Sequence, residues 1–150
     1  DGICNFMTAA WVTQISSKAI LVAIGKSHYT AELIEKAKHF SLSVLKADQC
    51  DLAKQCGTVS GRKADKVSSL AIVNSPDGDP MLQDAAAHFA CHVLRMDTVL
   101  DHVLICGEVV DARRNTTAIP FMGVFRVNAP FSHADPAIVR LPNDSFSFKN

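Results

Sequence analysis

The chain contains the stretch Gly25-Lys26-Ser27-His28-Tyr29-Thr30-Ala31-Glu32-Leu33-Ile34, which begins about a dozen residues after the stretch Asn5-Phe6-Met7-Thr8-Ala9-Ala10-Trp11-Val12-Thr13. The later stretch places a lysine, two hydroxyl side chains and a histidine in a turn that opens a helix. Such turns bind anions through backbone N–H groups and the positive end of the helix dipole. The earlier stretch is a strand end with small and hydroxyl-bearing side chains and one tryptophan, where a planar ring can lie against backbone amides. Together they predict a site for a planar, anionic ligand.

Further short motifs follow these two stretches in a fixed order. They are Gly57-Thr58-Val59-Ser60-Gly61-Arg62, Asp65-Lys66, Asp101-His102 and Gly107-Glu108-Val109. No single motif is specific, but the ordered set resembles the flavin reductase-like, FMN-binding split-barrel family, in particular its flavoredoxin-type branch, over about two-thirds of the chain. The resemblance implies a single flavin reductase-like FMN-binding domain over residues 1–150.

The chain begins where relatives have already supplied one barrel strand, so this domain is expected to lack the first strand of the barrel. Two explanations stay open for the missing strand. Either the sequence is truncated, or residues 138–148 pair with an edge that would otherwise be open.

Length and composition favour one compact domain, since the chain has 150 residues of which 48% are hydrophobic. Lysine plus arginine and aspartate plus glutamate number fifteen each. This balance leaves no basic field for nucleic acid or for an anionic membrane. No apolar segment approaches the roughly 18 to 20 residues of a membrane helix, and the N-terminus lacks a signal-peptide pattern. We therefore expect a cytoplasmic protein; the first residue is Asp1 and not methionine, so the natural start of the chain is not visible.

The cysteine pattern argues against a disulfide framework and against a zinc site. The chain has five scattered cysteines with no Cys-x-x-Cys spacing, namely Cys4, Cys50, Cys56, Cys91 and Cys106. Cys91 and Cys106 stand in apolar runs and are predicted to be small core residues, with a redox role as the alternative.

The expected fold class is mainly β with short helices, an FMN-binding split β-barrel. Residues 19–24 form a continuous apolar run, which predicts a strand buried on both faces, and residues 40–44 alternate between apolar side chains and serine, as a half-buried strand does. Further strands are expected at 70–74, 88–96, 99–112 and 122–128.

Two short helices are expected between these strands. Thr30 can cap a helix over residues 31–38, and Asp48 can cap a second over residues 49–56 with Gly57 just past its end. Residues 75–80 hold two prolines and a glycine, and they predict a turn.

The phosphate of the implied FMN requires several donors and at least one cation, because a phosphomonoester carries about two negative charges. Lys26 supplies the positive charge, and further donors come from Ser27, His28, Tyr29 and Thr30. The alternative is a surface turn in which Thr30 only caps the helix. Relatives often have arginine in place of His28, so FMN is expected to bind more weakly here, or in a way that depends on pH.

The flavin ring and ribityl chain are expected at residues of the earlier stretch that match the family. These residues are Asn5, Met7, Thr8, Ala9, Ala10 and Trp11. Trp11 either walls the ring or is an ordinary core aromatic. Ser60, Arg62 and Lys66 are further candidates for cofactor or dinucleotide contacts, with solvated turn residues as the alternative for the last two.

His102 is the candidate catalytic residue, because the Asp-His pair of the family tends to lie near the exposed edge of the flavin. There it would assist donor binding or supply a proton. The alternative is a half-exposed strand residue without a role in turnover. His88 and His92 would share one face of a strand, but without a third ligand at compatible spacing no metal site is predicted.

The resemblance implies an oxidoreductase that accepts reducing equivalents from NAD(P)H and passes them to a flavin, metal or protein acceptor. It also implies a homodimer with FMN near the subunit interface. Two alternatives stay open: a non-catalytic, flavoredoxin-like electron-transfer module that exchanges electrons with protein partners, and a flavin-free scaffold of the same fold.

Overall fold

The computed structural model describes residues 3–120. Within that range the chain forms seven strands and two helices. In order they are β1 (Trp11–Ser16), β2 (Ala19–Gly25), α1 (Tyr29–Ala37), β3 (His39–Val44), α2 (Cys50–Thr58), β4 (Ile72–Asn74), β5 (Pro80–Leu82), β6 (Ala87–Val99) and β7 (His102–Arg114). The expectation of a mainly β fold with short helices is confirmed.

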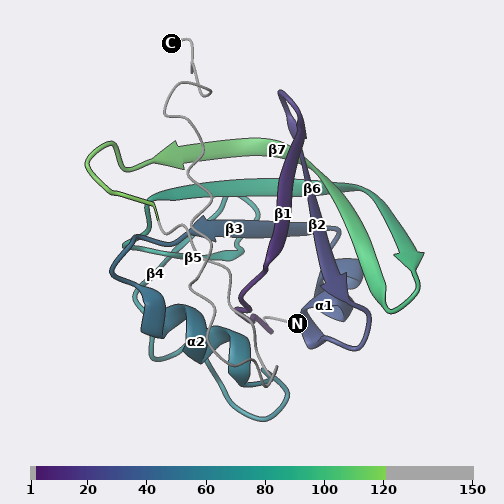
Figure 1. The fold of residues 1–150 in the computed structure, drawn as a ribbon, viewed down its shortest axis with the longest axis horizontal. Coiled ribbons are helices and arrows are strands. Elements are labelled where there is room, and N and C mark those ends of the chain that lie inside the picture. Colours follow the sequence, from purple (N-terminus) through teal and green to yellow (C-terminus); the bar gives the residue numbers. More distant parts are fainter. Residues whose placement is uncertain (1–2, 121–150) are drawn as a thin grey trace, which may run out of the picture.

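A five-stranded antiparallel sheet in the order β1-β2-β7-β6-β3 forms the body of the molecule. The long β6–β7 hairpin spans it from side to side (Figure 1). β2 pairs with the first half of β7, next to the hairpin turn, whereas β3 pairs with the first half of β6, away from that turn. The hairpin therefore holds the two halves of the domain together.

The main core lies between the inner face of this sheet and α1. It contains Ile20, Val22 and Ile24 of β2, together with Ile34 of α1 and the fully buried Ile105 of β7. The expectation that residues 19–24 are buried on both faces was wrong. Burial alternates along β2, because its other face is only half covered.

The alternation over residues 40–44 correctly predicted β3. The expected strands at 70–74, 88–96 and 99–112 exist as β4, β6 and β7, with ends that differ by up to three residues. The strand expected at 122–128 and the pairing segment 138–148 lie outside the described residues. Between residues 3 and 120, no helix is long and apolar enough to cross a membrane.

Both helices begin elsewhere than expected. α1 starts at Tyr29 after His28, and α2 starts at Cys50 after Gln49, in each case without a hydrogen bond from a capping side chain. Thr30 is thus inside the first turn of α1, and Asp48 lies before the start of α2. Gly57 also lies inside α2, which continues to Thr58.

The short β4–β5 hairpin lies beside β3, and its second strand was not expected, since residues 75–80 predicted only a turn. Pro80 is buried and its carbonyl accepts a hydrogen bond from Ser41 (2.7 Å), while the Leu82 N–H donates to Ser43 (3.1 Å). The serines that alternate along β3 therefore bind this second sheet instead of solvent.

Gly107 of β7 is packed tightly against the neighbouring strands β3 and β6. A β-carbon at this position would lie 2.7 Å from Phe40 Cζ and 3.0 Å from Cys91 Cβ. We expect Gly107→Ala to lower the free energy of unfolding by about 1–3 kcal/mol, because both neighbours must shift in a packed core. Urea denaturation measures this change.

The matched control is the same substitution in a Phe40→Leu background, where the smaller side chain removes the clash with the ring. In this background Gly107→Ala should lower the free energy of unfolding by less than it does in the wild type, because residues 107 and 40 are in contact and the effects of their substitutions do not add. If the cost of Gly107→Ala is the same in both backgrounds, the Phe40 ring does not restrict this position.

Candidate functional site

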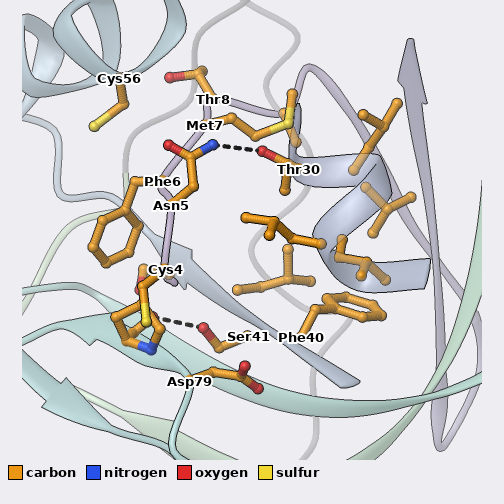
Figure 2. Close-up of a pocket in the computed structure, with 18 of the residues that line it drawn as sticks. Cys4, Asn5, Phe6, Met7, Thr8, Thr30, Phe40, Ser41, Cys56 and Asp79 are labelled. Atoms are coloured by element: carbon orange, nitrogen blue, oxygen red, sulfur yellow. Dashed lines mark hydrogen bonds between the residues drawn. The ribbon is translucent and has the colours of Figure 1, made fainter. Parts of the chain in front are cut away.

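A hollow of about 1660 Å³ lies between the inner face of the sheet, the two helices and the segment that precedes β1 (Figure 2). Eight of the residues predicted to hold the cofactor line it, namely Asn5, Met7, Thr8, Ala9, Ala10, His28, Tyr29 and Thr30. The two stretches that opened the sequence analysis thus meet at one site. Trp11, Lys26, Ser27, Ser60 and His102 lie outside this lining.

The segment of residues 3–10 crosses between the two helices. Asn5 Nδ2 donates to Thr30 Oγ1 in the first turn of α1 (2.8 Å) (Figure 2). Thr8 Oγ1 donates to the Ala53 carbonyl of α2 (2.5 Å). Thr30 therefore accepts a hydrogen bond from Asn5 instead of capping its own helix. These contacts hold the predicted ring-binding segment on both sides.

A tight turn joins β2 to α1. The His28 N–H donates to the Gly25 carbonyl (2.9 Å), and the His28 imidazole lies over Gly25, where a β-carbon would be 3.3 Å from His28 Cε1. The Lys26 N–H donates to the Asp101 carbonyl (2.9 Å). Lys26 and Ser27 are exposed beside the hollow, so the turn presents a cation and the N-terminus of α1 to solvent.

His102 lies next to this turn, because it pairs with Gly25 across β2 and β7. Its Nδ1 is 2.8 Å from Asp101 Oδ1, and its ring meets Trp11 edge-on with 4.9 Å between the ring centroids. The hydrogen bond from His102, with a smaller contribution from Lys26, lowers the pKa of the Asp101 carboxyl. Asp101 therefore stays ionised at neutral pH and can orient the imidazole.

In the loop after α2, Arg62 is exposed, as the alternative of a solvated turn residue expects, whereas Lys66 is not. Arg62 forms an ion pair with Glu32 of α1 and stacks over the Tyr29 ring, with 4.7 Å from Cζ to the centroid. Lys66 is buried, only 5% exposed, and donates to carbonyls at the end of α2. Ser60 is exposed, and its hydroxyl accepts from the Arg62 N–H (3.3 Å).

Two histidine–aspartate pairs hold the rim of the hollow at residues 77–79. His39 Nδ1 is 2.9 Å from Asp79 Oδ2, and His92 Nε2 is 2.9 Å from Asp77 Oδ2. Asp77 and Asp79 also line the hollow. The turn pattern of residues 75–80 gave no signal for this contact, because the partners come from β3 and β6.

Histidines and cysteines show no metal-binding geometry within residues 3–120, where no cluster of three or more suitable ligands exists. His88 contacts the Leu82 carbonyl instead of His92. Cys50, Cys56, Cys91 and Cys106 are free thiols. Cys91 is fully buried as expected, and burial raises its pKa to about 12, whereas Cys106 is half-buried.

Comparison with known proteins identifies the family of the chain. The model of the family described as flavin reductase like domain matches residues 1–126. The chain belongs to this family. A 4-nitrophenol 4-monooxygenase/4-nitrocatechol 2-monooxygenase reductase component from Rhodococcus opacus is 30% identical over 118 residues, which cover 77% of this chain and 62% of the relative.

Two solved structures of similar proteins share the fold. An FMN-binding protein from Thermus thermophilus with bound p-hydroxybenzaldehyde is 33% identical, with a TM-score of 0.70 over 73% of this chain and 63% of that one. An NADH:FAD oxidoreductase from Streptomyces globisporus, solved with NAD and FAD fragments, is 28% identical, with a TM-score of 0.70 over 85% and 79% of the two chains. The chain spans 63% and 62% of the length of the first two curated relatives it matches.

Proposed function

We propose that this flavin reductase-like domain binds FMN, accepts reducing equivalents from NAD(P)H and passes them to a flavin, metal or protein acceptor. The observation that carries the proposal is the junction at the hollow, where Asn5 and Thr30 are joined by a 2.8 Å hydrogen bond. This contact joins the stretch predicted to bind the ring to the turn predicted to bind the phosphate. Relatives named as a reductase component and as an NADH:FAD oxidoreductase support the reductase reading.

The residues present fit a flavin mononucleotide. The hollow has a volume of about 1660 Å³, which is larger than the roughly 300–1,000 Å³ typical of ligand pockets, so it has room for a ligand of this size. Its wall of Met7, Ala9 and Ala10 is apolar, as a planar ring requires. Beside it, Lys26 and Ser27 would hold the phosphate together with N–H groups at the start of α1. We favour FMN over FAD because the anion-binding turn suits a terminal phosphate.

A bound flavin supplies the hydride and electron chemistry, while the protein binds and orients the reactants. His102 would contact the nicotinamide or supply a proton at Nε2, because Asp101 occupies Nδ1. Trp11 packs against the imidazole and restricts its orientation. The carboxylate of Asp101 would also attract the Lys26 ammonium away from a bound phosphate. The affinity for FMN would therefore depend on how Lys26 divides its interaction between this carboxylate and the phosphate.

Anaerobic titration of the FMN-loaded protein with NADH and with NADPH tests the function. Bleaching of the flavin bands within seconds is the expected result. Bands that bleach only with a chemical reductant would favour an electron-transfer module without dehydrogenase activity. If the purified protein fails to bind FMN, the remaining hypothesis is a flavin-free scaffold of the same fold.

We propose further that two copies associate through the β1 edge of the sheet. Every residue of β1 is exposed, including Trp11 at 61% and Ile15 at 52%, and Leu100 in the β6–β7 turn is 87% exposed. An exposed apolar edge strand is a surface that proteins usually cover. A second copy that covers β1 would place its surface next to His102 and the flavin.

Removal of flavin should therefore weaken the dimer, because a ligand between two chains stabilises the associated state by mass action. Sedimentation velocity of the flavin-loaded and flavin-free protein over a dilution series measures this shift. Trp11→Ser should weaken the dimer in both forms. A monomer that binds one FMN per chain would contradict the interface model.

A further inference from the structure

Lys66 is a buried cation whose partners are backbone carbonyls. Its Nζ donates to the Cys56 carbonyl (3.0 Å) and to the Val59 carbonyl (2.7 Å). Lys66 forms no ion pair with a carboxylate among residues 3–120. The last carbonyls of α2 carry the negative end of the helix dipole, so they compensate the ammonium group.

This arrangement is a poor source of net stability. Burial lowers the pKa of the Lys66 ammonium from its ordinary value, with an opposing contribution from Cys56. An apolar side chain of similar length would fill the same space without the cost of removing a charge from water. The ammonium therefore serves to hold a particular backbone geometry.

That geometry is the turn that follows α2. Val59, which accepts from Lys66, lies two residues before Gly61, and the Ser60 carbonyl accepts from the N–H groups of Lys63 (2.9 Å) and Ala64 (3.2 Å). The turn is thus stabilised by hydrogen bonds within it, and Lys66 links it to the end of α2. Its position is fixed relative to the helix that walls the hollow.

Gly61 brings this turn against Asn5. A β-carbon at Gly61 would overlap the Asn5 carboxamide, so only the bare backbone allows the contact. Asn5 in turn donates to Thr30 (Figure 2). A continuous set of contacts therefore runs from Lys66 through the turn of Val59 and Gly61 to Asn5.

We propose that Lys66 is a positioning residue that sets the place of Asn5 in the flavin hollow through the Val59–Gly61 turn. The proposal rests on the proposed function, which assigns the flavin ring to residues 5–10. It predicts that Lys66 affects the ring part of the ligand and has no preference for the phosphate.

Lys66→Met should weaken FMN and riboflavin by the same factor, about twofold to tenfold, since a displaced Asn5 would lose about one hydrogen bond to the ligand. Both ligands are titrated by fluorescence. Lys63→Met is the matched control, because Lys63 is an exposed lysine in the same loop. Unchanged affinities, or a loss confined to FMN, would overturn the proposal.

A double-mutant cycle with Asn5→Ala separates positioning from a general structural role. If Lys66 acts through Asn5, then Lys66→Met should cause little further loss of riboflavin affinity in the Asn5→Ala background. A loss of equal size in both backgrounds would mean that Lys66 acts elsewhere. If Lys66→Met does not fold, Gly61→Ala takes its place in the cycle, because it displaces Asn5 and leaves Lys66 intact.

Amide hydrogen exchange of the flavin-free protein tests the positioning role of Lys66 independently of the proposed function, because it needs no bound flavin. Lys66→Met should speed exchange in residues 5–8 and 59–61 and leave β6 and β7 unchanged. A wild-type protein that does not bind FMN would refute the proposed function, while the exchange pattern would still report the coupling. Faster exchange across the whole domain, or an unchanged exchange rate at residues 5–8, would refute the positioning role.

Discussion

His102→Ala slows the reduction of bound FMN by NAD(P)H about tenfold to a thousandfold, the range expected when a group that positions a reactant or supplies a proton is lost. FMN affinity and melting temperature stay nearly unchanged, because the partners of His102, Trp11 and Asp101, are exposed at the surface and His102 lies outside the lining of the hollow. Stopped-flow absorbance under anaerobic conditions measures the rate.

The control for this result is Arg113→Ala, which also removes a β7 side chain bound to an aspartate but lies at the end of β7 away from the β2–α1 turn. It should leave the reduction rate unchanged. Asp101→Asn provides a second comparison, because it keeps the size of the partner and removes its charge. If reduction by the His102 variant is unaffected, or if the variant unfolds in step with its loss of rate, His102 is a structural residue.

Lys26→Ala weakens FMN by about 1.5–3 kcal/mol, which is about tenfold to 150-fold in the dissociation constant, because charge-assisted hydrogen bonds to the phosphate are lost. Riboflavin, which lacks the phosphate, keeps its affinity. Fluorescence titration with the two ligands measures the difference.

Lys18→Ala is the matched control, since Lys18 is an exposed lysine in the turn between β1 and β2. Asp101→Asn should move FMN affinity in the opposite direction, because it removes a carboxylate that competes for Lys26. Equal losses of FMN and riboflavin in Lys26→Ala would show that the phosphate binds elsewhere.

Periodicity and resemblance predicted much of this molecule. The alternation in residues 40–44 located β3, and the ordered motifs predicted that residues 5–10 and the start of α1 share a site. These signals are local, or they depend on matching residues in order along the chain. Both kinds of information are available without coordinates.

Features that depend on distant partners were not predictable from the sequence. Lys66 stands among polar residues in a loop and gave the pattern of a solvated turn, yet the end of α2 buries it. Thr30 matched a helix cap, but Asn5, 25 residues away, takes its hydroxyl. Pro80 suggested only a turn, because the partner that makes it part of a strand pair is Asn74 of β4. In each case, tertiary contacts decided between two locally acceptable arrangements.

The pairing of β2 with β7 also affects how the chain reaches its fold during synthesis. The partner strand of β2, β7, lies about 80 residues later in the chain, so the apolar side chains of β2 stay uncovered until β7 has been synthesised. At about 5–20 residues per second, a ribosome needs about 4–16 s to deliver it. During that interval the β1–β2 hairpin exposes aggregation-prone surface. Expression yield should therefore depend on translation speed and on holdase chaperones that cover this hairpin.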